Sequence, residues 1–365
     1  MDSRERLLTA LENGKPDHLP VQVHNWMRYY LDTYLGGCDQ YEAYARFGLD
    51  AVIYVSPHRT YAERDLDRWR VSHQELGADA DGVRHGVETI TTPGGTLTRR
   101  YATSPITSWD TECLIKNQDE FELFARYAPV PSRTDATPVI EAKRRIGANG
   151  IVRGGVSGYG QGSPWQDFCV LVGTEPAIMY AMDEPEWTHH ALEVILRKRL
   201  RWIEQLRGVP FDVIEAGGGA GSNTVISPKL FREFCLPYDQ RQNKLLHELG
   251  LRVVYHLCGG LMRMLELVVE NGADGLETMT PPSMGGDCAL AEANRRVGKD
   301  LFFIGGFDQN AGFEHGTPEA VRRQVYALHA ACPDGGYICS PSDHFFHGNP
   351  ANLQAFADAA KECRY

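Results

Sequence analysis

The sequence lacks any long apolar run, and none of its hydrophobic stretches approaches the roughly 18 residues that a membrane-spanning helix needs. It also lacks an excess of basic residues: 37 Lys and Arg stand against 48 Asp and Glu, a net charge of −11, which argues against a general nucleic-acid binder. The first residues, MDSRERLLTALEN, are charged and helical in pattern, unlike a signal peptide. We therefore expect a soluble, cytoplasmic protein that binds neither membrane nor nucleic acid.

Paired cysteines are missing as well. The nine cysteines are an odd number, lie scattered along the chain and form no Cys-x-x-Cys motif, which excludes a secreted disulfide framework. We expect most of them to be small buried hydrophobes. No linker, repeat or low-complexity tract divides the chain, and its 42% hydrophobic and 23% charged residues are typical of a globular protein. Residues 1–365 are therefore predicted to form a single domain.

Strand-like runs that alternate with helical patterns predict the fold. Eight such runs occur, at residues 20–24, 51–56, 151–156, 211–216, 252–258, 275–279, 301–305 and 337–340. Most are continuously apolar and precede a helical pattern, as expected for buried parallel strands. Eight repeats predict an α/β fold, a closed (β/α)8 TIM barrel. Residues 72–103 break the alternation and are predicted to form a β-hairpin excursion on the barrel rim, too short for a core of its own.

The ends of the fifth and eighth predicted strands carry potential metal ligands. A TIM barrel builds its active site at the carboxyl ends of its strands. His256 and Cys258 are two residues apart, so alternation along a strand places them on the same side, and Cys339 ends the eighth strand. Imidazole and thiolate together favour zinc, and a catalytic zinc keeps one position open. The pattern predicts a zinc site of His256, Cys258 and Cys339, with Glu277 as a displaceable fourth ligand or a substrate contact.

Several other polar residues end predicted strands. Glu215 could orient a substrate, carry a proton or support the metal, or it could instead pair with a cation from a neighbouring helix. Asp308 is a weaker candidate for an acid or base near the metal. His24 and Asn25, at the end of the first strand, could contact substrate or form a hydrogen-bonded loop pair. Glu215 and Asp308 are therefore our catalytic candidates, and His24, Asn25 and Glu277 our substrate-binding candidates.

Motifs along nearly the whole chain carry a resemblance to a known superfamily. They are RERLLTAL at residues 4–11 with Pro16-Asp17 and Pro20, TPGGTL at 92–97, ISP at 226–228, PY at 237–238, GADG at 272–275, and SPSDHFF at 340–346 with Asn349-Pro350. The chain resembles the uroporphyrinogen decarboxylase-like superfamily, whose members are (β/α)8 barrels. Its His-x-Cys…Cys arrangement is similar to that of cobamide-dependent methyltransferases, and the resemblance matches His256, Cys258 and Cys339 to their zinc ligands.

The resemblance implies a zinc-dependent enzyme that moves a methyl group between the cobalt of a corrinoid and a small O-, N- or S-methyl substrate or a thiol acceptor. The chain has no Asp-x-His-x-x-Gly stretch for a corrinoid, so a separate corrinoid protein would supply the cobalamin. The alternative is metal-independent decarboxylation. That branch relies on an Arg-rich segment after the first strand and an Asp after the second, where this chain has only Arg28 and no Asp at Ser56 or Pro57. A non-catalytic binding barrel is the third possibility.

Overall fold

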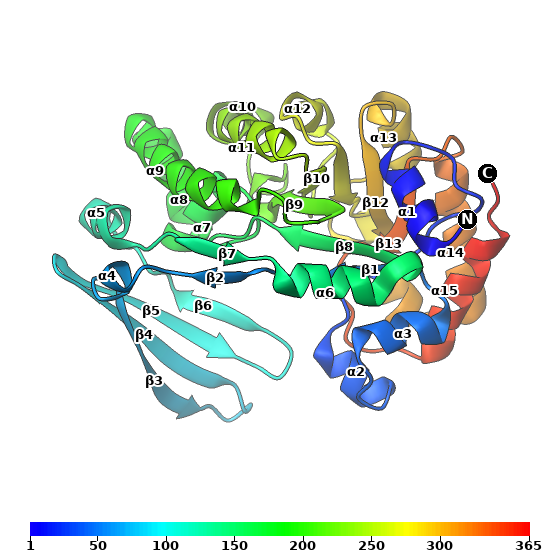
Figure 1. The fold of residues 1–365 in the computed structure, drawn as a ribbon, viewed down its shortest axis with the longest axis horizontal. Coiled ribbons are helices and arrows are strands. Elements are labelled where there is room, and N and C mark those ends of the chain that lie inside the picture. The colour runs from blue at the N-terminus through cyan, green and yellow to red at the C-terminus, as the bar shows by residue number, and fades with distance from the viewer.

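The computed structural model describes residues 1–365 and contains a curled parallel sheet surrounded by helices, with an antiparallel sheet on one side (Figure 1). The parallel strands pair in the order β1-β8-β9-β10-β11-β12-β13. Their bounds are β1 Ala51–Tyr54, β8 Gly150–Gly155, β9 Val213–Gly217, β10 Val253–His256, β11 Gly275–Thr278, β12 Phe302–Phe307 and β13 Tyr337–Pro341. Each lies within or next to one of the predicted runs.

The remaining predicted run, residues 20–24, takes the eighth position of the barrel wall. Val21 forms a parallel bridge with Cys339 of β13. On the other side, the backbone N–H of Asp50, just before β1, donates to the carbonyl of Val21 at 2.9 Å. The segment therefore lies between the last and the first strand of the sheet. The predicted (β/α)8 TIM barrel is confirmed, although its first strand is reduced to a single bridge.

The half of the barrel interior at the amino ends of the strands, called the lower half below, is apolar and is closed by a helix. Helix α1 (Ser3–Leu11) starts with a capping box, in which Asp2 and Glu5 each accept from the other's backbone N–H. Its apolar side chains join those of the strands in a separate buried cluster: Leu7, Ala10, Leu11, Val52, Ile151, Val213, Val254, Phe302, Ile304 and Ile338. This cluster fills the end of the barrel that contains the strands' amino ends, so only the other end is left for polar groups.

The remaining helices cover the outside of the barrel and extend its rim. They are α2 Arg28–Tyr34, α3 Gln40–Phe47, α4 Glu63–Leu66, α5 Gln118–Tyr127, α6 Thr137–Ile146, α7 Pro164–Val172, α8 Thr174–Asp183, α9 Pro185–Ile203, α10 Pro228–Phe234, α11 Leu236–Glu248, α12 Leu265–Glu270, α13 Leu290–Val297, α14 Pro318–Ala331 and α15 Pro350–Glu362. Ser227 and Thr317 cap α10 and α14 before a proline at the first helical position. No helix is both long enough and apolar enough to cross a bilayer.

The excursion on the rim is larger than the sequence predicted. It is a four-stranded antiparallel sheet of β3 Arg70–Ala78, β4 Arg84–Thr92, β5 Gly95–Thr103 and β6 Ser108–Glu112. The last strand was missed because its sequence, SWDTE, has almost no apolar alternation. Every residue of β3 is exposed, whereas the paired Ile90 and Leu97 are buried in the main hydrophobic cluster together with Phe124 of α5. The sheet therefore attaches to the barrel through its central strands (Figure 1).

Two short strands near the rim complete the fold. Strand β2 (His58–Thr60) follows β1 and pairs antiparallel with β7 (Arg133–Asp135). Together with α4 and α5 they connect the antiparallel sheet to the barrel wall, close to α9.

Candidate active site

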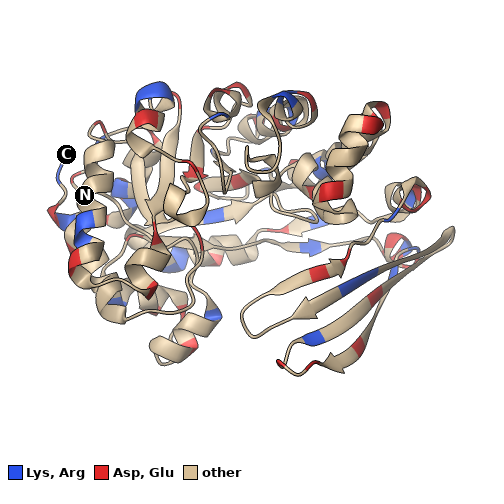
Figure 2. Ribbon diagram, turned by 180° about the vertical axis from the view of Figure 1, so that it is seen from behind, with Lys and Arg blue, Asp and Glu red and all other residues tan.

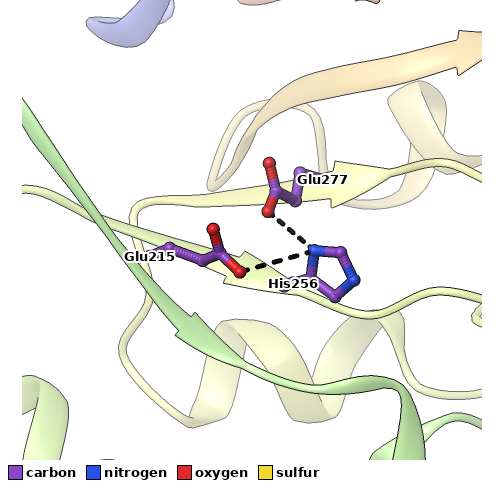
Figure 3. Close-up of side chains that lie close together, drawn as sticks. All are labelled: Glu215, His256 and Glu277. Atoms are coloured by element: carbon purple, nitrogen blue, oxygen red, sulfur yellow. Dashed lines mark hydrogen bonds and ion pairs between the residues drawn. The ribbon is translucent and has the colours of Figure 1, made fainter. Parts of the chain in front are cut away.

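A charged layer lies above the apolar half of the barrel. It contains Arg153 on β8, Glu215 on β9, His256 on β10 and Glu277 on β11. The first three each stand two residues after an apolar member of the lower cluster, so strand alternation directs them into the same interior. Figure 3 shows Glu215, His256 and Glu277 pointing toward one another from neighbouring strands. The layer lies toward the carboxyl ends of the strands, where TIM barrels carry their sites.

Arg153 holds the two carboxylates together. Its Nη2 donates to Glu215 Oε2 at 2.9 Å and also to Glu277 Oε1. The Tyr54 hydroxyl donates to Glu215 Oε2 at 3.2 Å, and the guanidinium lies 4.5 Å from the centroid of the Tyr54 ring. The side chain of Arg153 is 1% exposed, that of Glu277 0% and that of Glu215 14%. Glu215 is therefore the carboxylate that solvent or a small substrate can reach.

His256 completes the charge balance. Its Nδ1 lies 2.9 Å from Glu277 Oε1 and 3.7 Å from Glu215 Oε1. Burial alone would lower the pKa of His256, but hydrogen bonds to the Cys258 thiol and to Glu277, with the charges of both carboxylates, raise this pKa well above its usual value. Burial opposes ionisation of Glu277, yet Arg153 and His256 keep its pKa below the usual range. A protonated His256 and Arg153 thus neutralise the two glutamates.

The β11 end of the site has unusual local structure. Glu277 Oε2 is buried and accepts no hydrogen bond. The next two residues, Thr278 and Met279, have φ angles of +75° and +44°, which is rare for residues other than glycine and a genuine outlier for a β-branched threonine. Strained backbone of this kind concentrates at functional sites. The geometry therefore leaves an unsatisfied acceptor beside a strained turn at the barrel mouth.

The predicted convergence of His256 and Cys258 is present. Strand β10 ends at His256, and the Cys258 thiol is close enough to the imidazole to raise the pKa of His256. The glycine-rich segment after β9 makes room for it: a Cβ on Gly219 would lie 2.5 Å from Cys258 Sγ. Gly217 has φ +88° and crosses so close to β10 that a Cβ there would lie 2.5 Å from the His256 carbonyl oxygen. The glycines thus allow the close approach of β9 to the His-x-Cys segment.

Further imidazoles line the mouth. The ring of His24 lies 5.8 Å from that of His256 and 5.1 Å from that of His344, measured between centroids. Burial lowers the pKa of His24 to about 3, so its imidazole is neutral at physiological pH. Asn25 is half-buried beside it. His344 Nδ1 lies 3.0 Å from Asp343 Oδ1, so these two residues after β13 form a pair that faces His24.

The predicted position of Cys339 is wrong. Ile338 belongs to the interior cluster, so alternation along β13 turns Cys339 outward. There it is fully buried beside Tyr337, with Cys332 and Cys363 close by, and burial raises the pKa of its thiol far above the usual value. Cys339 therefore lies in the layer between strand and helices and does not join His256 and Cys258. Strand-end position alone could not reveal this, because a shift of one residue exchanges the two faces.

Asp308 also lies outside the charged layer. Its Oδ2 accepts from the Ser283 hydroxyl at 2.5 Å and its Oδ1 from the backbone N–H of Ala311 at 2.8 Å. Oδ1 thus stabilises the turn after β12, and Oδ2 ties this turn to the segment after β11. The structure groups Glu215, Glu277, His256, Cys258 and His24, and leaves Asp308 apart from them.

Sequence reasoning missed Arg153 and Tyr54. A signal for Arg153 was available, because it is the one charged residue in the otherwise apolar strand sequence GIVRGG. A charge in a buried strand is rarely tolerated without partners and is therefore a candidate for a polar network. Tyr54 gave no such signal, because tyrosine is common in strands.

Three side chains are close enough to hold a metal ion. Glu215, His256 and Glu277 each offer a ligand atom, and these atoms lie within 4.8 Å of one another. However, the guanidinium of Arg153 already binds both carboxylates, so a cation placed between them would face a fixed positive charge. Cys258, which also interacts with the imidazole, forms no hydrogen bond with Arg153.

Sequence relatives include methyltransferases and decarboxylases. The chain is 24% identical over 194 residues to the methylated-thiol–coenzyme M methyltransferase of Methanosarcina mazei, covering 53% of this chain and 49% of that protein. It is 36% identical over 143 residues to the uroporphyrinogen decarboxylase of Neisseria meningitidis, covering 38% and 36%. The methylcobamide:CoM methyltransferase MtbA of Methanosarcina acetivorans is 26% identical, covering 42% and 43%. The chain thus spans about half or less of the length of these curated relatives.

A solved methyltransferase from Methanosarcina mazei has the same fold over nearly the whole chain. Its TM-score is 0.67 at 15% identity, with 99% of both chains covered. The family model of uroporphyrinogen decarboxylase (URO-D) matches residues 120–363, well over half of the sequence and every strand from β8 to β13. The chain therefore belongs to the uroporphyrinogen decarboxylase family.

Proposed function

We propose that this protein is a zinc-dependent methyltransferase. It transfers a methyl group between a small O-, N- or S-methyl substrate, or a thiol acceptor, and the cobalt of a corrinoid carried by a separate partner protein. The observation that carries the proposal is that the Cys258 thiol, which lies against Gly219 after β9, is close enough to the His256 imidazole to raise its pKa. The relatives named as methyltransferases support the reaction class.

The donor set fits zinc at the Cys258 side of His256. A metal-binding histidine normally donates its other ring N–H to a carboxylate, which fixes the ring and increases its basicity. Glu277 Oε1 occupies that position at 2.9 Å from His256 Nδ1. His256 and Cys258 are then two of the three protein ligands expected of a catalytic zinc. The Asp343–His344 pair, which faces His24 across the mouth, would provide the third in place of Cys339.

Zinc bound there would supply a Lewis acid that favours thiolate over thiol or stabilises a departing alkoxide. The chain's own residues prepare the site. Binding requires His256 to give up one proton and Cys258 another, so metal affinity increases with pH. Glu277 keeps the Nδ1–H of His256 in place, and Arg153 keeps Glu277 ionised. Glu215, the partly exposed carboxylate, is the group able to orient a substrate amine or hydroxyl or accept its proton.

The shortage of unpaired cationic side chains at the barrel mouth argues against decarboxylation of a porphyrinogen. Such a substrate carries eight carboxylates and requires several free cations at the mouth. The two cations of the charged layer, Arg153 and the protonated His256, are already neutralised by Glu215 and Glu277. Arg28 follows the first strand, but its side chain is 69% exposed and pairs with Asp32. The identity to Neisseria decarboxylases nevertheless makes this reaction the competing outcome to test.

Metal content and methyl transfer of matched cysteine variants test the proposal. We expect about one zinc per chain in the purified protein, as measured by inductively coupled plasma mass spectrometry. Cys258→Ala should lose both the zinc and methyl transfer to cob(I)alamin. Cys38→Ala changes a half-buried thiol that lies in the loop after α2 and should change neither. Zinc and activity retained in Cys258→Ala would refute the proposal.

A further inference from the structure

A cavity lies outside the barrel, beside the loop that follows β8. It has a volume of about 350 Å³ and is bounded by α9, β2, α4 and the connection from α5 to β7. Five aromatic side chains line it: Tyr61, Trp69, Phe124, Tyr159 and Trp202. Its lining includes none of the residues of the charged layer. It is therefore a site of its own, large enough for a small aromatic molecule.

Two cations in this cavity have no carboxylate partner. The Arg59 guanidinium lies 4.0 Å from the centroid of the Trp202 ring and donates to the Ser157 carbonyl at 3.2 Å. Lys198 Nζ donates to the Ala128 carbonyl at 2.8 Å. Burial, and then the nearby charge of Arg201, lower the pKa of Lys198 to about 8, against the opposing effect of the Asp65 carboxylate. These charges are held in an aromatic environment where an anionic ligand would be attracted strongly.

The other charged residues of the cavity neutralise each other. Asp167 and Arg199 also line it, but they form a buried ion pair at 2.5 Å. Asp167 additionally accepts from the backbone N–H groups of Tyr159 and Gly160, which fixes the loop after β8 as one wall. The cavity thus has a rigid wall and two cationic side chains that form no ion pair.

A smaller basic cavity adjoins the first. It has a volume of about 190 Å³ and shares Pro129, Val130 and Lys198 with the aromatic cavity. It adds three arginines, none of which forms an ion pair: Arg68, Arg126 and Arg201. The guanidinium groups of Arg68 and Arg126 lie 4.9 and 5.5 Å from the centroid of the Tyr127 ring. Figure 2 shows Lys and Arg in blue where α4 and α5 meet the barrel.

This concentration of positive charge is unexpected in a chain with a net charge of −11. The one acidic residue of the smaller cavity, Asp65, lies 3.5 Å from Arg64, which is not part of the lining. Like charges held this close repel one another, so they favour an anion between them. Lys198 belongs to both cavities and marks the point where the aromatic and basic parts meet.

We propose that the two cavities together bind an aromatic ring that carries a carboxylate or a phosphate. The ring lies among the aromatic side chains of the larger cavity, where offset or edge-to-face contacts favour it. The anionic group lies at Lys198, toward the arginines of the smaller cavity, where charge-assisted hydrogen bonds are stronger than neutral ones. This site is independent of the methyl-transfer proposal, because it shares no residue with the metal ligands.

Calorimetric titration of the full chain tests the inference with four probes: benzoate, phenyl phosphate, benzyl alcohol and inorganic phosphate. We expect at least one of the two aromatic anions to bind tenfold or more tightly than both benzyl alcohol and inorganic phosphate. Comparison of benzoate with phenyl phosphate distinguishes the two anionic groups. The affinity should fall as ionic strength increases. Equal affinity for benzyl alcohol, or no binding of either aromatic anion at millimolar concentration, would overturn the proposal.

Variants locate the binding. Lys198→Met should weaken binding of the aromatic anion at least tenfold, and Arg201→Gln, at an exposed position, provides a second change that should leave the fold intact. Arg197→Met is the matched control, since this neighbouring side chain on α9 is 63% exposed and lines neither cavity. Cys258→Ala should bind the anion as the original chain does, which separates this inference from the proposed activity. Unchanged affinity in both Lys198→Met and Arg201→Gln would contradict it.

Discussion

Replacement of Arg153 by leucine should destabilise the fold strongly at neutral pH. The side chain is 1% exposed and binds two carboxylates, one of which, Glu277, is completely buried. Removal of one partner from a buried ion pair typically costs about 3–5 kcal/mol, because the remaining charge stays buried and unpaired. We expect a loss of this size in the free energy of unfolding at pH 7. Arg28→Leu, which removes an exposed pair on α2, should cost about 0.5 kcal/mol or less.

The stability difference between the original chain and Arg153→Leu should depend on pH. In the original chain the pKa of Glu277 is lowered, so its contribution to stability is present above the unfolded pKa of about 4.3 and is lost as the pH falls through the folded pKa. Without Arg153, burial dominates and raises the pKa of Glu277. At low pH the carboxylate of the variant therefore becomes protonated, and the cost of an unpaired buried charge disappears. Urea unfolding at pH 7 and at pH 4.5 should therefore show a larger difference between the two proteins at pH 7.

Two results would refute this reasoning. One is a loss of less than about 1 kcal/mol at pH 7, which would mean that the charged layer is well solvated. The other is an equal loss at both pH values, which would assign the effect to lost packing and not to charge. A double variant, Arg153→Leu with Glu277→Leu, should recover part of the stability, because it replaces the closest buried pair by apolar groups.

Three further predictions concern single residues. Glu215→Gln should lower the rate of methyl transfer at least about tenfold, or ~1.4 kcal/mol of transition-state stabilisation, with zinc content and melting temperature nearly unchanged. A loss of stability with full activity per folded molecule would instead show that Glu215 is not part of the site. Cys339→Ala should cost about 1 kcal/mol of stability and leave the zinc content unchanged, which elemental analysis checks. Burial raises the pKa of Asp239 to about 7, despite its hydrogen bond from Tyr255 and the charge of Arg199. The contribution of Asp239 to the free energy of unfolding is therefore present below the unfolded pKa of about 3.9 and is lost as the pH rises through 7. Asp239→Asn should accordingly make the chain more stable at pH 8 than the original, and equal unfolding curves at pH 8 would contradict this.

The fold was predictable because the strands of a parallel barrel are continuous apolar runs bounded by helix caps. The predicted first strand, residues 20–24, agrees least with the structure, because it pairs only through a single bridge at Val21 and backbone hydrogen bonds to residues far along the chain. The strand Ser108–Glu112 was not predictable, since it forms by pairing with β5 and has no hydrophobic pattern of its own.

The site was predictable only in part. The structure places Cys258 beside His256, as alternation predicted, and groups Glu215 and Glu277 with His256, while the roles assigned to these residues stay predictions. It failed for Cys339, because the face of β13 that points inward depends on a register that the sequence does not show. Arg153 was overlooked because it lies in mid-strand, although its charge in an apolar run indicated a buried partner.

A comparison of two reactions on the original chain tests the central claim most directly. The purified protein is incubated with cob(I)alamin and a panel of O-, N- and S-methyl compounds, and separately with uroporphyrinogen without any corrinoid. We predict conversion of cob(I)alamin to methylcobalamin with at least one methyl donor, followed by absorbance, and no loss of carboxylates from the porphyrinogen. Decarboxylation of the porphyrinogen with no methyl transfer from any donor would contradict the account.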